Sequence, residues 1–100
     1  MNTQFDFWFK TITPAEINAG IAERIRTIRR RRKISQEKLS EQSGVSLGSV
    51  KRFERSGEIS LLSLTKIAIA LGLQTDMQNL FKDIPFQSIE EIKNAENNRT

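Results

Sequence analysis

Basic and hydroxyl side chains gather in one short stretch of the chain, in a pattern suited to contacts with a polyanion. Lysine and arginine neutralise phosphates, serine hydroxyls donate to phosphates or base edges, and arginine can bind guanine through two hydrogen bonds. We expect Arg52 to read a base and Leu47 to contact a thymine methyl group, while Gly48 allows a close approach. A phosphate contact, or a surface ion pair with Glu54 or nearby acids, is the alternative for Arg52. The predicted DNA contacts in this stretch are Ser46, Leu47, Gly48, Ser49, Lys51, Arg52 and Arg55.

Residues 35–55, SQEKLSEQSGVSLGSVKRFER, must position these side chains. Leu39 is the apolar anchor of a first short helix, and Gly44 supplies the backbone freedom of a sharp turn. Ser46 is a suitable N-cap for a second helix, in which Val50 and Phe53 form one apolar face. The pattern predicts a helix-turn-helix, whose second helix has the size of an element that enters a DNA major groove.

The charge distribution also favours a polyanionic partner. Residues 24–55 contain 11 Lys/Arg and 3 Glu, whereas the rest of the chain contains 5 basic and 9 acidic residues. A basic centre with acidic flanks suits nucleic acid. Arg30 and Arg31, at the end of the preceding predicted helix, are further candidates for phosphate contacts. The alternative is a solvated basic helix face.

The same sequence argues against catalysis. It has no Cys and no His, which removes the commonest metal ligands and the commonest general base. It contains no Gly-rich phosphate loop, and the adjacent Glu90 and Glu91 would not converge on one substrate from a helix. We therefore expect no enzyme activity, cofactor or metal. The chain has no apolar run of about 20 residues and no signal-peptide pattern, so we expect a cytoplasmic protein without membrane contact.

Helix signals recur on both sides of this stretch and predict an all-α fold of five helices. Thr13, Pro14 and Glu16 mark the start of a helix running to about Arg32, and Ser60 caps another that ends at Gly72. The expected division is an arm over 1–12, a helix-turn-helix domain over 13–82 and a tail over 83–100. The expected apolar faces of the flanking helices are Ile17, Ile21, Ile25 and Ile28, then Leu61, Leu64, Ile67, Ala68 and Leu71, then Met77, Leu80 and Phe81 in a short helix beginning at Thr75 or Asp76.

The N-terminal arm carries four of the seven aromatic residues, Phe5, Phe7, Trp8 and Phe9. Phe5, Phe7 and Phe9 alternate with Asp6 and Trp8, which predicts a short strand, and a single strand is unstable alone. The arm therefore packs on its own domain or contacts a dimer mate or another partner. Met77, Leu80, Phe81 and Phe86 are further candidates for such a contact. For Leu80 and Phe81, packing in the core is the preferred interpretation. The polar composition from Asn94 predicts disorder in part of the tail.

Gln36, Ser40, Gly44 and Val50, with Arg52-Phe53-Glu54-Arg55, resemble the lambda-repressor-like (Xre-type) helix-turn-helix family over roughly residues 17–82. Ser40 stands where that family usually has Ala. The resemblance implies a compact five-helix domain that binds palindromic double-stranded operator DNA as a homodimer. It also implies a DNA-backbone contact from Gln36. Arg29 and Glu54 are expected to form a structural ion pair, so Arg29 is not counted as a DNA contact.

The run SLGSVKRFERSGEISL and the layout of the tail look like small HipB-like regulators. This resemblance implies an autoregulating antitoxin with a HipA-like kinase toxin as its partner. Two alternatives remain open. One is a stand-alone Xre-type repressor or restriction-modification controller, and the other is mainly a protein-interaction module that retains the fold as a scaffold.

Overall fold

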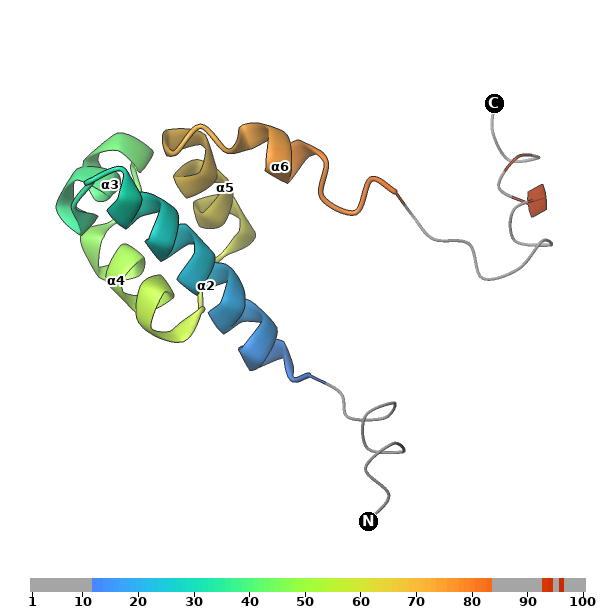
Figure 1. Ribbon diagram of the computed structural model, residues 1–100, viewed down its shortest axis with the longest axis horizontal. Helices are drawn as coiled ribbons and strands as arrows, with labels where there is room; N and C mark the ends of the chain where they lie inside the picture. The colour runs from blue at the N-terminus through green and yellow to red at the C-terminus, as the bar shows by residue number, and fades with distance from the viewer. Residues whose placement is uncertain (1–11, 84–92, 95, 97–100) are drawn as a thin grey trace, which may run out of the picture.

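The computed structural model describes residues 12–83, 93, 94 and 96, and five helices lie within 12–83 (Figure 1). No strand occurs among these residues. The predicted strand at residues 5–9 and the candidate Phe86 lie outside them. The helices are α2 (Pro14–Arg31), α3 (Gln36–Ser43), α4 (Leu47–Ser56), α5 (Leu61–Ala70) and α6 (Gln74–Gln78).

Side-chain caps begin α2, α4 and α5 where the sequence predicts them, whereas α6 begins at Gln74, before the expected Thr75 or Asp76, and has no side-chain cap. Thr13 Oγ1 accepts a hydrogen bond from the Glu16 amide at 3.1 Å, with Pro14 in the first helical position. Ser60 Oγ accepts in the same way from the Ser63 amide at 3.0 Å. These bonds satisfy amides that have no partner inside the helix, which is why such local signals fix helix starts.

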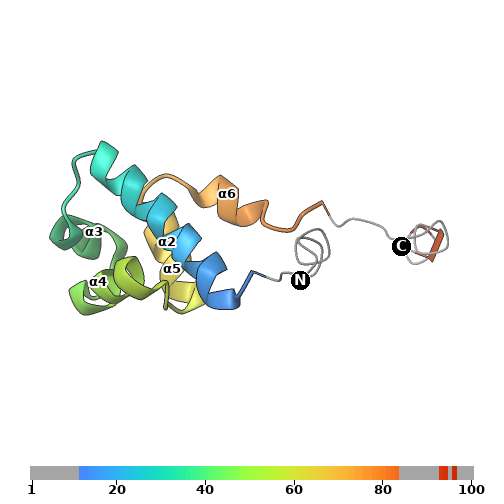
Figure 2. The ribbon, with the colours of Figure 1, turned by 60° about the horizontal axis from the view of Figure 1, so that its bottom comes forward.

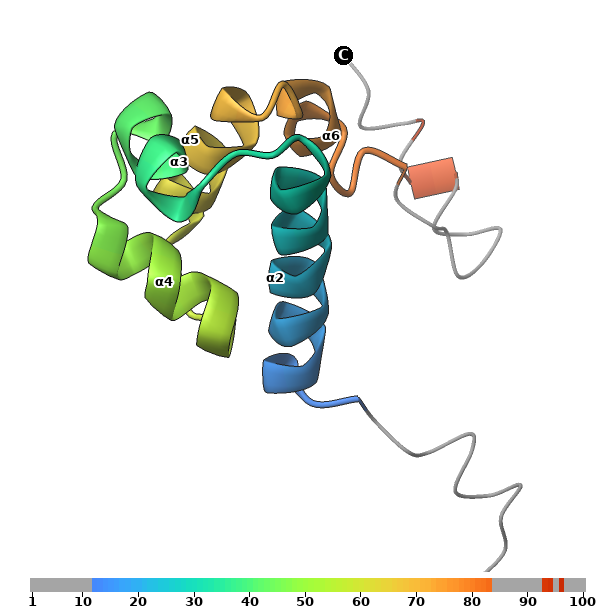
Figure 3. The same cartoon turned by 60° about the vertical axis from the view of Figure 1, so that its left-hand side comes forward.

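The helices pack around one apolar core. Helix α2 lies along α4, α3 contacts both α4 and α5, and α6 contacts α5 (Figures 2 and 3). Arg32 at the end of α2 donates a hydrogen bond to the Leu71 carbonyl at the end of α5, which joins these two helix ends. The buried apolar residues of the core are Ala22, Ile25, Leu39, Val45, Val50, Phe53, Ile67, Ala68 and Leu71.

Several apolar residues expected in the core lie outside it. Ile17 and Leu61 are exposed, and the core interpretation of Leu80 and Phe81 is also wrong because both are exposed, Phe81 by 84%. Ile17 precedes the buried stretch of α2, and Leu61 is the first residue of α5. Helical spacing identifies the apolar face, but it does not reveal where the packing partner of that face ends.

Gly57 fixes the approach of α4 to α2. Its φ of +81° lies in the left-handed region. A Cβ added there would lie 2.8 Å from the Asn18 carbonyl carbon and 2.9 Å from the Ala19 amide nitrogen. The residue that ends α4 therefore touches the backbone of α2, and the positive φ and the close contact both require glycine.

Candidate nucleic-acid interface

Helices α3 and α4 form the predicted helix-turn-helix. Gly44 ends α3 with a φ of +75°, and its amide donates to the Ser40 carbonyl. The Ser40 hydroxyl donates to the Val45 carbonyl at 2.6 Å across the turn. Ser46 caps α4 by accepting from the Ser49 amide at 3.2 Å. These local bonds hold the turn and set the direction of α4.

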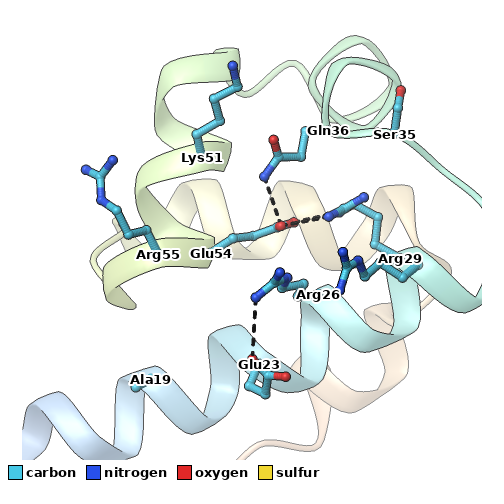
Figure 4. A pocket seen from close by; sticks show the side chains of 10 residues that line it. Ala19, Glu23, Arg26, Arg29, Ser35, Gln36, Lys51, Glu54 and Arg55 are labelled. Carbon is cyan, nitrogen blue, oxygen red and sulfur yellow. Dashed lines mark hydrogen bonds and ion pairs between the residues drawn. The ribbon is translucent and has the colours of Figure 1, made fainter.

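Glu54 anchors α4 to the rest of the domain. Its Oε2 accepts from Arg29 Nε at 2.7 Å, and its Oε1 accepts from Arg29 Nη2 at 2.8 Å (Figure 4). Gln36 Nε2 donates to the same Oε1 at 3.0 Å. Arg29 Nη1 also donates to the Ile34 carbonyl at 2.7 Å. One carboxylate therefore joins α2, α3 and α4, and the pair expected between Arg29 and Glu54 is present.

The environment of Glu54 stabilises its charged form. Burial would raise the pKa of the Glu54 carboxyl, but hydrogen bonds from Arg29 and Gln36 act in the opposite direction. The charges of Arg29 and Arg26 lower it further, so the pKa lies below its ordinary value. Only 4% of the Glu54 side chain and 9% of the Arg29 side chain are exposed. The pair is therefore a structural tie, as expected, rather than a pair of surface charges.

A cleft of about 780 Å³ opens between α2 and α4 beside this tie. We call it the cationic cleft, because five basic side chains and two carboxylates line it. Glu54 is paired with Arg29, and Glu23 Oε2 lies 4.0 Å from Arg26 Nη1, a long distance for an ion pair. An excess of positive charge therefore faces the opening. The lining residues are Ala19, Glu23, Arg26, Arg29, Arg30, Ser35, Gln36, Lys51, Glu54 and Arg55.

A second hollow of about 350 Å³ lies on the other side of α4. Arg52 and Glu58 both line it, and Arg52 Nε and Nη2 donate to Glu58 Oε2 at 3.0 and 2.9 Å. Both side chains are 64% exposed, so solvent screens this pair. Gly48 lies on the exposed face of α4, with Lys51 and Arg55 at the cationic cleft and Ser49 and Arg52 at the second hollow.

Arg30 and Arg31, the two candidate phosphate contacts on α2, lie in different surroundings. Arg30 lines the cationic cleft, whereas the adjacent Arg31 does not. One residue corresponds to about 100° of helix rotation, which places these two side chains on different sides of α2. The domain thus presents Arg30 beside α4 and presents Arg31 to solvent elsewhere.

Other candidates are already engaged or partly covered. Ser46 Oγ donates to Ser49 Oγ at 2.9 Å, and Gln36 is bound to Glu54. Leu47, expected on the exposed face of α4, is half-buried, as is Met77 on α6. The aromatic candidates Phe5, Phe7, Trp8, Phe9 and Phe86 lie outside the described residues.

Sequence reasoning missed two charged residues near α4. Arg26 lines the cationic cleft, and its spacing of four from Arg30 was the signal that could have found it. Glu58 pairs with Arg52 from the connection after α4, which agrees with the alternative of a surface ion pair with a nearby acid, although the sequence did not identify Glu58 as that acid. Loop geometry sets that contact, and no periodic pattern predicts it.

Within residues 12–83, 93, 94 and 96, no three acidic side chains converge as a metal site would require. Among the helices of this described part, none combines the length and apolar character needed to span a membrane.

Comparison with known families agrees with this geometry. Residues 25–77, which contain the last two turns of α2, all of α3, α4 and α5, and most of α6, match the helix-turn-helix family. The chain belongs to this family, in its Xre or lambda-repressor-like form, and thus to a class of DNA-binding domains rather than enzymes. No curated protein and no solved structure matches the chain. Helix α4 is the recognition helix of such a domain.

Proposed function

We propose that the chain is a sequence-specific transcriptional repressor that binds palindromic operator DNA as a homodimer. The observation that supports this most strongly is the setting of the recognition helix. Glu54 ties the inner side of α4 to α2 and α3, while Lys51, Arg52 and Arg55 remain exposed on its outer side. A rigidly held helix with cations on its free face suits insertion into a major groove.

The cationic cleft would receive the sugar-phosphate backbone at one edge of that groove. A helix with its side chains is about 10–12 Å across, close to the ~12 Å width of the major groove, so the backbone must run beside it. Lys51 and Arg55 reach this cleft from α4, and Arg26 and Arg30 reach it from α2. These four cations are the proposed phosphate contacts, which supply salt-sensitive affinity.

Arg52 is the proposed base-reading residue. It lies on the side of α4 away from the cleft, and its bonds to Glu58 use Nε and Nη2. The Nη1 group is not used in these bonds and can approach a base edge. A bidentate contact with guanine would require the guanidinium to leave Glu58 in part, and the high exposure of this pair keeps that exchange inexpensive.

Gln36 and Ser35 begin α3 at the edge of the cationic cleft. The start of a helix presents unpaired amides and positive dipole charge to an anion. Glu54 uses one hydrogen of the Gln36 amide, which leaves its other hydrogen for a phosphate. Glu54 would thus orient Gln36 toward the DNA backbone as well as holding Arg29.

A second copy is proposed because one domain of this size reads only a few base pairs. Palindromic operators pair two recognition helices about one helical turn apart. The exposed apolar residues Ile69, in the last turn of α5, and Leu80 and Phe81, after α6, are proposed as the surface for that copy, and Met77 of α6 is half-buried. Exposed apolar surface of this kind is typical of interaction sites when it is contiguous.

Within this class, we place the chain with HipB-like antitoxins that bind a HipA-like kinase and their own operator. The resemblance of SLGSVKRFERSGEISL and of the tail supports this assignment. A stand-alone Xre-type repressor or restriction-modification controller is the second candidate. Copurification of a kinase encoded beside this chain would distinguish the first from the second.

The test is fluorescence anisotropy of the purified chain on its promoter fragment and on scrambled DNA, across a salt series. We expect clear preference for the promoter and a steep loss of affinity with salt. Arg52→Ala should lose promoter binding more than scrambled-DNA binding, and Ser63→Ala, in the same hollow, should retain the preference. Weak binding to both DNAs would contradict the repressor function and favour the protein-interaction module.

A further inference from the structure

An apolar groove of about 170 Å³ lies where the first half of α2 meets the end of α4 and the start of α5. The first half of α2, the connection from α4 to α5 and the first turn of α5 form its walls. No charged side chain lines it, in contrast to the cationic cleft. The lining residues are Asn18, Ile21, Phe53, Gly57, Ile59, Leu61 and Leu64.

Large apolar side chains at the rim of this apolar groove are exposed to solvent. Leu61 lines the groove with 68% of its surface exposed, and Ile17, one turn before Ile21, is also exposed. The absence of charge disfavours DNA or an acidic peptide as the occupant. An apolar side chain would remove these surfaces from water.

The chain carries a suitable occupant close by. We propose that the N-terminal segment of residues 5–9 of the same chain docks on the apolar groove and inserts one aromatic ring. The segment holds Phe5, Phe7, Trp8 and Phe9, four of the seven aromatic residues. A cavity of about 150 Å³ lined by Leu, Ile and Phe is large enough for benzene, so a groove of this size accepts one ring.

The connecting chain is long enough for this arrangement. Ile21 lies seven residues after Pro14, which corresponds to about 10 Å along α2. Phe7 precedes Ile12 by five residues, which span at most about 17 Å when extended. The N-terminal end of α2 lies beside the end of α4, close to the groove walls (Figures 2 and 3). A segment that folds back along the first turns of α2 can therefore reach the groove.

Covalent attachment favours the segment of the same chain over that of a second copy. A short flexible tether holds its end at an effective concentration in the millimolar range, far above that of a separate molecule in dilute solution. Docking on the groove does not depend on DNA binding, and packing on its own domain is one of the two roles that the sequence of the aromatic arm allows.

Trp8 provides a direct test, because the chain has one Trp and no Tyr. Tryptophan fluorescence therefore reports only on this segment. Leu61→Glu places a charge at the groove, and Leu62→Glu is a matched control, since Leu62 is 66% exposed and does not line the groove. We expect Leu61→Glu to shift Trp8 emission to longer wavelength and to increase its quenching by acrylamide, while Leu62→Glu matches the wild type. Helical circular dichroism verifies folding of both variants.

Disulfide trapping in this Cys-free chain tests which copy supplies the segment. Phe7→Cys combined with Leu61→Cys should form a monomeric cross-link about tenfold faster than Phe7→Cys with Leu62→Cys, because the bond requires close Cβ atoms. Covalent dimers as the main product would overturn docking within one chain. Equal cross-linking rates, or an emission shift of equal size in both Glu variants, would overturn docking on the groove.

Discussion

Arg29 on α2 and Glu54 on α4 face each other through two parallel hydrogen bonds of 2.7 and 2.8 Å, 25 residues apart in the chain. Gln36 shares the same carboxylate, so the geometry of three helices depends on one acidic side chain. The pair is almost fully buried and lies at the base of the cationic cleft. Glu54 therefore both holds the three helices together and lines the cleft proposed to bind DNA.

Glu54→Gln should destabilise the domain by about 3 kcal/mol, because it leaves the Arg29 charge buried without a counter-charge. The double variant Arg29→Met with Glu54→Leu should recover most of this loss, since apolar residues of similar volume remove the unpaired charge. Urea unfolding followed by circular dichroism measures both free energies. If the double variant is less stable than Glu54→Gln, the attraction within the pair must exceed the cost of burying its two charges.

The lowered pKa of Glu54 predicts a loss of stability in acid. The folded chain binds this proton more weakly than the unfolded chain, so falling pH favours unfolding. The contribution of Glu54 is complete above the unfolded pKa of about 4.3 and is lost as pH falls through the lower folded pKa. The free energy of unfolding, measured from pH 7 to pH 3, should therefore fall more steeply for the wild type than for Glu54→Gln. Parallel curves would contradict a lowered pKa.

The sequence revealed much of this fold because several of its determinants are local. The caps Thr13, Ser46 and Ser60 bond to amides three residues away, so short patterns suffice to find them. The partner of Arg29 lies on another helix, and only the resemblance to a family indicated Glu54.

Contacts set by tertiary geometry could not be found in this way. Glu58 reaches Arg52 from a connection, and Arg30 and Arg31 differ only in the direction in which α2 presents them. The exposure of Phe81 also depends on where α6 ends relative to the core. The periodicity of apolar residues predicts neither this ion pair, nor the directions of the two arginines, nor the exposure of Phe81.

Gly57→Ala should be more destabilising than Gly44→Ala, although both glycines have positive φ. An L-residue in this conformation costs about 1–2 kcal/mol at either site. At Gly57 the new Cβ would also press on the α2 backbone, whereas nothing lies within 4 Å at Gly44. We expect a further loss of about 1–3 kcal/mol for Gly57→Ala. Urea unfolding of the two variants measures the difference, and equal losses would mean that α2 and α4 separate easily.

Glu58→Gln should strengthen DNA binding about fivefold, on the order of 1 kcal/mol, by releasing Arg52 and removing a negative charge beside the proposed interface. Asp76→Asn on α6 is a control for charge alone, since Asp76 lines neither the cationic cleft nor the second hollow. Anisotropy titrations on promoter DNA compare the two variants. Weaker promoter binding by Glu58→Gln would instead indicate that Glu58 orients Arg52 for base reading.

Arg30→Ala and Arg31→Ala form a matched pair, because they remove the same charge from adjacent exposed positions of one helix. Only Arg30 lines the cationic cleft, so only its loss should remove a phosphate contact. For Arg30→Ala we expect weaker binding to promoter and scrambled DNA alike, and a plot of log affinity against log salt that is shallower by about 0.9. The slope for Arg31→Ala should remain that of the wild type, measured by anisotropy from low to high salt. If both variants flatten the slope equally, general basicity and not the cleft between α2 and α4 would account for phosphate binding.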